Sequence, residues 1–276
     1  MTIKLNNTYI QHTDGSQQFS SVEEKEFYVY SADHWTVLNG GKCCLWTVPV
    51  GTTSIKFELL SGGGPGGSSG GDYDVGIGGQ GGNYTVKTIT RNVAAFVDGS
   101  TYTICAAGTS DCSCCCSCNM NCKHGCTSFV TGLGLSNFCA VGGMGGSTNW
   151  DVMSSCYNCF ISNVTCDLGN YNAGWINNVC NSPTYGGDIE FRGVSGSMRR
   201  TQPDCCADIH GVAGSPAGPF ASWHGIGGKH ACMGNNACCS HHSSWPGGGG
   251  GANITAATSA CAGSFGAGGL VRVTYS

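Results

Sequence analysis

The sequence has little charge, no basic tract and no long hydrophobic run. Charged residues make up 10% of the 276 residues, and the formal net charge is −4. Nucleic-acid binding depends on clustered Lys and Arg, so this composition argues against it. No apolar run reaches the roughly 18 residues of a membrane-spanning helix, and the first residues form no apolar signal core. We therefore expect no membrane insertion, and synthesis in a reducing cytoplasm.

Helix is disfavoured by the glycine content. Gly accounts for 47 residues, and each Gly inside a helix costs about 1 kcal/mol relative to Ala. Residues 53–60 instead alternate, with Ile55, Phe57 and Leu59 on one face, which is typical of a half-buried strand. The other predicted strands span residues 26–31, 34–39, 43–48, 83–90, 100–107 and 269–276.

Residues 1–40 differ from the rest of the chain because they contain few Gly, no Cys and an acidic cluster. We interpret them as an N-terminal attachment segment that packs against a neighbouring subunit. Residues 41–276 then form one glycine- and cysteine-rich β domain. The alternative is that the first 40 residues contribute a hairpin to that same domain.

Glycine-rich stretches separate the predicted strands, at residues 62–71, 76–82, 142–146, 225–228, 247–251 and 263–269. One interpretation is flexible linkers. We favour ordered segments in a polyproline-II-like form, which has three residues per turn and no internal hydrogen bonds, so that neighbouring segments can bond to one another. Six mobile linkers in one small domain would be unusual. The predicted fold is therefore mainly β, a sandwich-like framework with polyglycine-II-type segments, Cys-rich loops and little helix.

Most of the 21 Cys gather in four groups, three of which also contain His. Their members are Cys112, Cys114, Cys115, Cys116, Cys118, Cys122, His124 and Cys126; Cys156, Cys159 and Cys166; Cys205, Cys206 and His210; and His230, Cys232, Cys238, Cys239, His241 and His242. Thiolate and imidazole ligands bind zinc or iron, the iron also as an iron–sulfur cluster. The groups therefore predict metal sites.

Disulfides are the second interpretation of these cysteines, and the two are compatible. Bridges would restrict the unfolded state of a glycine-rich chain and stabilise the fold by about 2–4 kcal/mol each. They would form in an oxidising environment, after cell lysis. Inert free thiols are a third interpretation, which the number of Cys disfavours. No H-E-x-x-H motif or nucleophile elbow is present, so we predict no catalytic residues and no enzyme.

The run from Trp46, WTVPVGTTSIKFELLSGGGPGG, resembles the opening of glycine-rich domains in phage tail and tail-fibre proteins. The likeness continues through GGNYTVKTI from Gly81, GSTYTI from Gly99, YGGDIEFRG from Tyr185 and GGLVRV from Gly268. It implies a virion component that stacks polyglycine segments and presents variable loops to a bacterial surface receptor. The Cys content departs from that family, and residues 112–126 resemble metallothioneins instead.

The sequence thus predicts a structural virion protein, made in the host cytoplasm, that forms homo-oligomers, with a trimer favoured, or docks onto other tail proteins. The alternatives are an extracellular bacterial fibre or adhesin subunit and a metal-binding storage or redox protein. One group of aromatic residues fits either saccharide stacking at loop tips or capping of a sparse core. It comprises Trp150, Tyr157, Phe160, Tyr171, Trp175, Trp223 and Trp245.

Overall fold

The computed structural model describes residues 4–6, 9–11, 17–19, 24–30, 41–66, 78–92, 94–109, 125–146, 184–194, 196–200, 209–212, 214–219, 245–251 and 265–276. All regular secondary structure in these ranges is β, and they contain no helix that could cross a membrane. The predicted fold class is confirmed.

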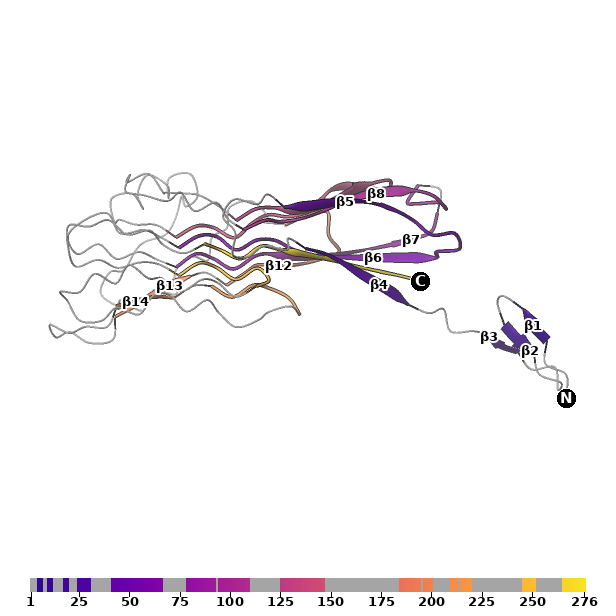
Figure 1. Ribbon diagram of the computed structural model, residues 1–276, viewed down its shortest axis with the longest axis horizontal. Coiled ribbons are helices and arrows are strands. Elements are labelled where there is room, and N and C mark those ends of the chain that lie inside the picture. The colour runs from indigo at the N-terminus through magenta and orange to yellow at the C-terminus, as the bar shows by residue number, and fades with distance from the viewer. Residues whose placement is uncertain are drawn as a thin grey trace.

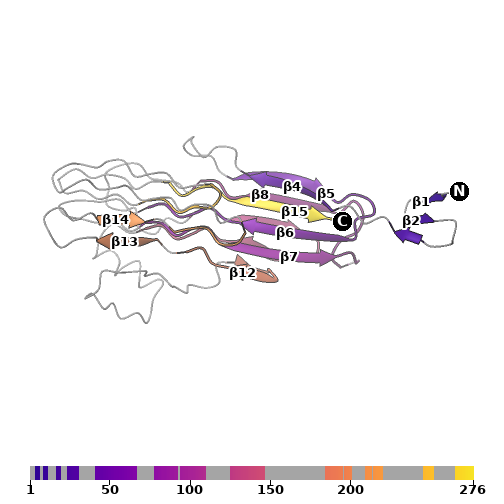
Figure 2. The same cartoon turned by 90° about the horizontal axis from the view of Figure 1, so that it is seen from below.

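Two five-stranded antiparallel sheets face each other and form a sandwich (Figure 1). The first sheet has the order β11–β10–β9–β8–β5, and the second has the order β12–β7–β6–β15–β4 (Figure 2). The strands are β4 (Lys25–Tyr30), β5 (Lys42–Thr47), β6 (Ser54–Leu60), β7 (Tyr84–Thr90), β8 (Thr101–Ala106), β9 (Ser128–Gly132), β10 (Leu135–Ala140), β11 (Thr184–Tyr185), β12 (Ile189–Phe191) and β15 (Leu270–Tyr275).

The core lies between the two sheets, where every second side chain of each strand points inward. Ile55, Phe57 and Leu59 of β6 are fully buried, as the alternation predicts, and they face Tyr102 and Ile104 of β8. At the edge of the sandwich the Trp46 ring packs among four other rings. Its centroid lies 5.3 Å from Phe27, 5.4 Å from Tyr275, 6.1 Å from Tyr102 and 6.4 Å from Phe57.

Three short strands, β1 (Lys4–Asn6), β2 (Tyr9–Gln11) and β3 (Gln17–Phe19), form a separate antiparallel sheet. Within the predicted attachment segment, β4 pairs along its whole length with β15 of the sandwich. The attachment role of residues 1–40 stays a prediction. The remaining hairpin, β13 (Ser197–Arg200) with β14 (Ile209–Val212), pairs outside both sheets.

The predicted strands within residues 26–31, 43–48, 53–60, 83–90, 100–107 and 269–276 are all present, with ends shifted by at most one residue. The strand predicted at residues 34–39 lies outside the described residues. The β9–β10 hairpin was not predicted. Its alternation is broken by a register shift between Leu135 and Phe138, where Asn137 adopts a left-handed φ of 49°.

The glycine-rich segments leave one end of the sandwich and run side by side as extended, wavy chains (Figure 1). We call this bundle the glycine array, and the end of the sandwich from which it extends the glycine end. It comprises residues 61–66, 78–83, 107–109, 125–127, 141–146, 193–194, 196, 214–217, 247–251 and 265–269. Parts of five of the six predicted stretches belong to it, whereas residues 225–228 lie outside the described residues.

Backbone hydrogen bonds join the array with a period of three residues. Along residues 79–82, the first and fourth amides donate to one neighbouring segment, and the second and third donate to two others. These donations run from Gly79 to Gly250, Gln80 to Met144, Gly81 to Val194 and Gly82 to Gly247, with N···O distances of 2.8, 2.8, 3.0 and 2.6 Å. A three-residue turn without internal hydrogen bonds has this geometry, so the polyglycine-II-type arrangement is confirmed.

The same period recurs along residues 61–64. Their amides donate in turn to Asn83, Cys126, Ala267 and Gln80, with N···O distances of 2.9, 3.1, 2.9 and 2.8 Å. The first and fourth partners again belong to one segment, residues 78–83. The two central segments thus each bond to several neighbours, and the array is a three-dimensional lattice instead of a sheet.

Close approach of the backbones explains why these positions are Gly. A Cβ atom at Gly64 would collide with the carbonyl of Met144, and one at Gly79 would collide with the carbonyl of Gly64. Both contacts fall below 3.0 Å, a separation that real Cβ atoms essentially never show. No side-chain movement relieves such an overlap, because the colliding atoms belong to backbones that are held by hydrogen bonds.

Polar side chains occupy the junction where sheet hydrogen bonding gives way to the lattice. The Ser128 hydroxyl donates to the Leu60 carbonyl at 2.7 Å and accepts from the Ala107 amide at 2.9 Å. Asn83 donates through Nδ2 to the Val141 carbonyl at 2.7 Å and accepts from the Gly193 amide at 3.0 Å. These buried groups satisfy backbone atoms that neither pattern pairs.

Replacing Gly64 by Ala tests the close packing of the array. Gly268 is the matched control, because a Cβ atom there would come no closer than 3.1 Å, to the carbonyl oxygen of Ala107. Overpacking predicts that Gly64→Ala lowers the free energy of unfolding by about 1–3 kcal/mol more than Gly268→Ala does. Urea denaturation of both variants measures the difference, and equal unfolding free energies would contradict a tight lattice.

Candidate functional site

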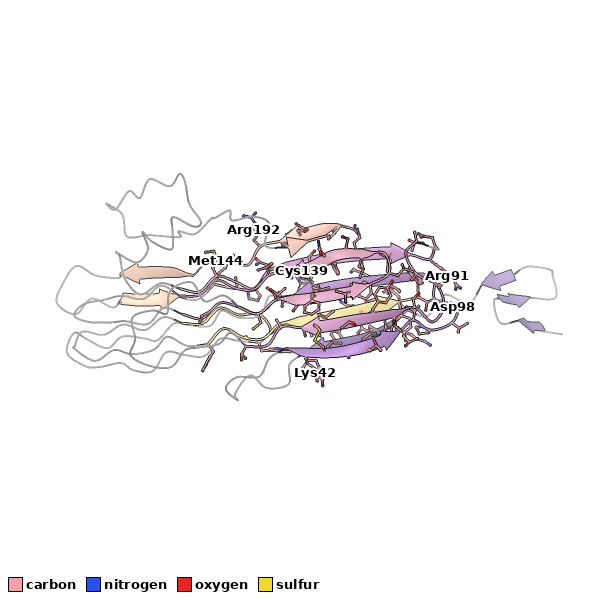
Figure 3. The ribbon with its side chains drawn as sticks, turned by 90° about the horizontal axis from the view of Figure 1, so that it is seen from above. Lys42, Arg91, Asp98, Cys139, Met144 and Arg192 are labelled. Carbon is pink, nitrogen blue, oxygen red and sulfur yellow. A yellow bond between two sulfur atoms is a disulfide. The ribbon has the colours of Figure 1, made fainter. Side chains whose placement is uncertain are left out.

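The sandwich has two chemically different ends. The base end, opposite the array, carries the turns at residues 48–53, 94–100 and 133–134, and Figure 3 shows Arg91 and Asp98 there, away from Met144 of the array. Because Lys25 pairs with Tyr275, both the start of β4 and the C-terminal strand end lie at the base. The glycine array extends from the opposite end of the sandwich (Figure 1).

Hydrogen bonds fix the turns of the base end. Arg91 forms an ion pair of 2.7 Å with Asp98, whose carboxylate also accepts from the Gly51 amide at 3.1 Å. These two interactions lower the pKa of Asp98. The buried Tyr102 hydroxyl donates to the carbonyls of Ala95 and Leu133, and burial raises its pKa to about 12. These contacts tie together the turns at residues 48–53, 94–100 and 133–134.

Most predicted metal ligands fall in stretches of sequence that lie between the described parts of the chain. The described chain stops at Thr109 and resumes at Gly125, and comparable breaks follow residues 146, 200, 219 and 251. The following candidates lie outside the described residues: Cys112, Cys114, Cys115, Cys116, Cys118, Cys122, His124, Cys156, Cys159, Cys166, Cys205, Cys206, His230, Cys232, Cys238, Cys239, His241 and His242. Their role in metal binding stays a prediction.

Two candidates lie within the described residues. Cys126 is half-buried in the array, and its Sγ lies 3.6 Å from the Thr109 carbonyl oxygen. His210 belongs to β14, where its backbone pairs with Arg199. Among residues whose side chains are described, no three His, Cys, Asp or Glu are placed to hold a metal ion.

The contact between Cys126 and Thr109 joins the chain on either side of the most Cys-rich stretch of the sequence. The two residues flank positions 110–124, and the array fixes Cys126 because its carbonyl accepts from the Gly62 amide at 3.1 Å. The fold itself therefore holds together the parts of the chain that precede and follow these positions.

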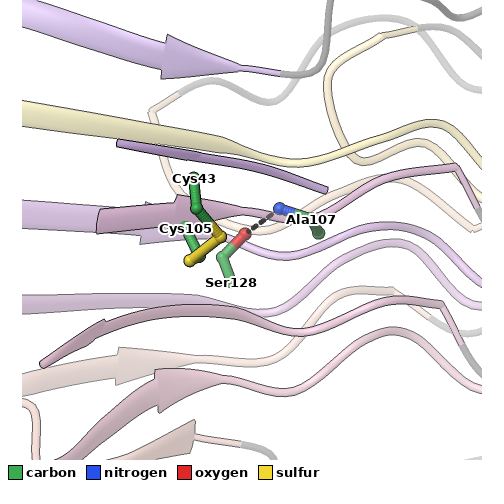
Figure 4. The surroundings of a disulfide bond; sticks show 4 residues. All are labelled: Cys43, Cys105, Ala107 and Ser128. Carbon is green, nitrogen blue, oxygen red and sulfur yellow. Dashed lines mark hydrogen bonds between the residues drawn. A yellow bond between two sulfur atoms is a disulfide. The ribbon is translucent and has the colours of Figure 1, made fainter. Parts of the chain in front are cut away.

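Among the cysteines that the structure describes, Cys43 and Cys105 form a disulfide (Figure 4). The two residues are direct cross-strand partners with a Cα–Cα distance of 4.1 Å, and the bond ties the edge strand β5 to β8. It closes a chain of 62 residues in sequence separation, including β6 and β7 of the other sheet. The bridge therefore closes a loop of chain that passes through both sheets. It also secures β5, which is an edge strand with only one neighbour.

Two thiols of the first sheet, those of Cys44 and Cys139, have raised pKa values. Burial raises the pKa of Cys44, which packs against the core, although nearby Lys42 partly opposes this shift. Burial also raises the pKa of Cys139, and the negative charge of Glu190 adds to the effect. A protonated thiol is a poor nucleophile and a poor metal ligand, so neither residue fits a reactive site.

The family of this chain is shown by a match that covers most of its residues. A family model described as a glycine-rich domain matches residues 38–276, which include the array and all sandwich strands except β4. The chain belongs to this glycine-rich domain family. No curated protein is significantly similar to it. The glycine-rich part of the predicted resemblance is thus confirmed, and its phage-tail part remains a prediction.

The junction residues Asn83 and Ser128 were not predicted, nor was Ser61, whose hydroxyl accepts from the Asn83 amide at 2.7 Å. A signal was present, since each small polar residue lies between an alternating strand and a glycine segment. The buried carboxylate of Glu58 was also unexpected, because it lies on the outer face of β6. It accepts from the Tyr84 hydroxyl at 2.6 Å, and burial together with this bond raises the pKa of Tyr84.

Removing the disulfide tests its contribution. We expect Cys43→Ser with Cys105→Ser to lower the free energy of unfolding by about 2–4 kcal/mol, because the unfolded chain regains the freedom of a long loop. Denaturation under oxidising conditions measures the loss, with Cys139→Ser as the control. Peptide mapping without reductant should recover the Cys43–Cys105 pair. A double variant as stable as the control would contradict the assignment.

Proposed function

We propose that this chain is a structural component of a tailed-phage virion, a tail-fibre or tail-tip protein that contributes to recognition of the host surface. Cys-bound metal, disulfides or both would stabilise its Cys-rich segments. In this proposal the protein is made in the host cytoplasm, is not an enzyme, and assembles with further copies or with other tail proteins.

The two-ended arrangement of the domain carries the proposal. The start of β4 and the end of β15 meet at the base end, whereas the glycine array extends from the opposite end (Figure 1). A domain anchored by its base would present its glycine end outward. The predicted Cys-rich residues 112–126 are joined in the chain to array residues 109 and 125–127, and loops joined to a rigid scaffold tolerate changes of sequence, which suits recognition of changing receptors.

The physical properties of the array support a role outside the cell. Its stability depends on backbone hydrogen bonds among at least six segments, and such buried bonds leave few backbone groups accessible to proteases. A disulfide within the sandwich persists in an oxidising environment. Both properties fit a particle that must survive outside its host.

Two alternatives predict different observations. A bacterial fibre or adhesin subunit would use the same scaffold but would be found on the bacterial envelope. A metal-storage or redox protein would release or cycle its metal, and elemental analysis with a thiol count would detect it. That alternative gives no reason for a sandwich of ten strands, and we therefore rank it below the virion role.

Antibodies raised against the purified chain test the proposal. They should label the tails of particles whose genome encodes it in immunogold electron microscopy, and their Fab fragments should reduce adsorption to host cells. Fab fragments against the major capsid protein are the control. Labelling of the bacterial envelope alone would contradict a virion role. Tail labelling with unchanged adsorption would contradict recognition and leave a structural role.

A further inference from the structure

Exposed aromatic rings gather on the outer face of the second sheet at its β4 edge. Tyr28 and Tyr30 alternate with the inward-facing Phe27 and Val29, and they are 43% and 46% exposed. Trp245, at the start of an array segment, is 37% exposed, and its ring meets that of Tyr30 edge-on at 5.6 Å. We call Tyr28, Tyr30 and Trp245 the aromatic platform.

A charged network borders the platform. Arg272, the cross-strand partner of Tyr28, places its guanidinium carbon 6.0 Å from the centre of that ring. Glu26 binds Arg272 at 2.8 and 3.0 Å, and its other oxygen accepts from the Tyr28 hydroxyl at 3.2 Å. On the far side, Glu58 lies 3.6 Å from Arg272 and 3.3 Å from Lys56.

These contacts hold the platform in a fixed arrangement. Tyr28 and Tyr30 belong to a strand that is paired along its whole length, and their rings contact Arg272 and Trp245 respectively. The chain after Trp245 enters the array at once, where the Gly247 amide donates to Gly268 at 2.8 Å. A preorganised surface loses little conformational entropy when a ligand binds.

The chemistry of the platform specifies its ligand. Tyr and Trp rings each combine a flat apolar face with a polar atom at the rim, which complements the C–H face and the surrounding hydroxyls of a pyranose ring. The carboxylates of Glu26 and Glu58 balance the cations of Arg272 and Lys56. This local charge balance favours a neutral ligand over an acidic one.

We propose that the aromatic platform is a binding site for neutral saccharides, with pyranose rings lying against Tyr28 and Tyr30 and hydroxyls bonding to Glu26 and Arg272. The site lies on the outer face of the second sheet at its β4 edge and uses none of the predicted metal ligands. It therefore does not rest on the virion role, and the two proposals can fail separately.

A glycan array probed with the full-length protein tests this site, with neutral hexose and N-acetylhexosamine oligosaccharides beside acidic polyuronates. We expect binding to neutral oligosaccharides, and calorimetry on those bound should show a roughly tenfold loss of affinity for Tyr28→Ala and for Tyr30→Ala, because each removes one stacking face. Tyr28→Phe keeps the ring and should bind within about threefold of the unmodified protein.

Phe191→Ala is the matched control, because Phe191 is 52% exposed at the opposite edge of the same sheet. It should bind as the unmodified protein does, and thermal melting should show that all four variants fold. The proposal is overturned if no neutral oligosaccharide binds, if only polyuronates bind, or if Phe191→Ala loses as much affinity as Tyr30→Ala. It is also overturned if the platform variants change only the oligomeric mass in light scattering, which would identify a protein interface.

Discussion

Hydrogen bonding between closely packed, glycine-rich backbones is the constraint on which this structure depends. In a sheet, each strand bonds to two neighbours in one plane, whereas the amides of residues 79–82 point in turn to three different segments. Such a lattice forms only if the chains approach more closely than a Cβ atom allows, as Gly64 and Gly79 illustrate. The Gly residues of the array are thus the material of an ordered body, despite the flexibility that Gly confers on an unfolded chain.

The sandwich and the array depend on each other. Glycine-rich segments have no hydrophobic pattern to set their register. The strands that precede or follow them must therefore set it. β6 delivers residues 61–66, and residues 78–83 and 265–269 lead directly into β7 and β15. Ser128 and Asn83 then bridge the change in hydrogen-bond pattern. In return, the array extends the ordered body beyond the core without requiring more apolar residues.

The sequence predicts the parts of the fold in which a periodic pattern of residues is present. Alternation locates β6 and β15, and the grouping of Gly between strands indicates ordered segments. Which segment bonds to which does not follow, because Gly carries no pairing information, and Asn137 hides the β9–β10 hairpin by breaking its period. The same holds for the candidate sites: Cys spacing indicates metal chemistry, but pairing Cys43 with Cys105 requires the register of β5 on β8. The aromatic platform likewise requires the pairing of β4 with β15, which brings Arg272 to Tyr28.

Amide hydrogen exchange tests the lattice most directly, because exchange reports whether each backbone donor is bonded in the folded state. The amides of Gly64, Gln80, Gly143 and Gly250 all donate to other array segments at 2.8–2.9 Å. Protection of these four amides to the same degree as the central amides of β6 and β15 is the predicted result. Exchange at the rate of an unstructured chain, with β6 and β15 still protected, would contradict an ordered glycine array.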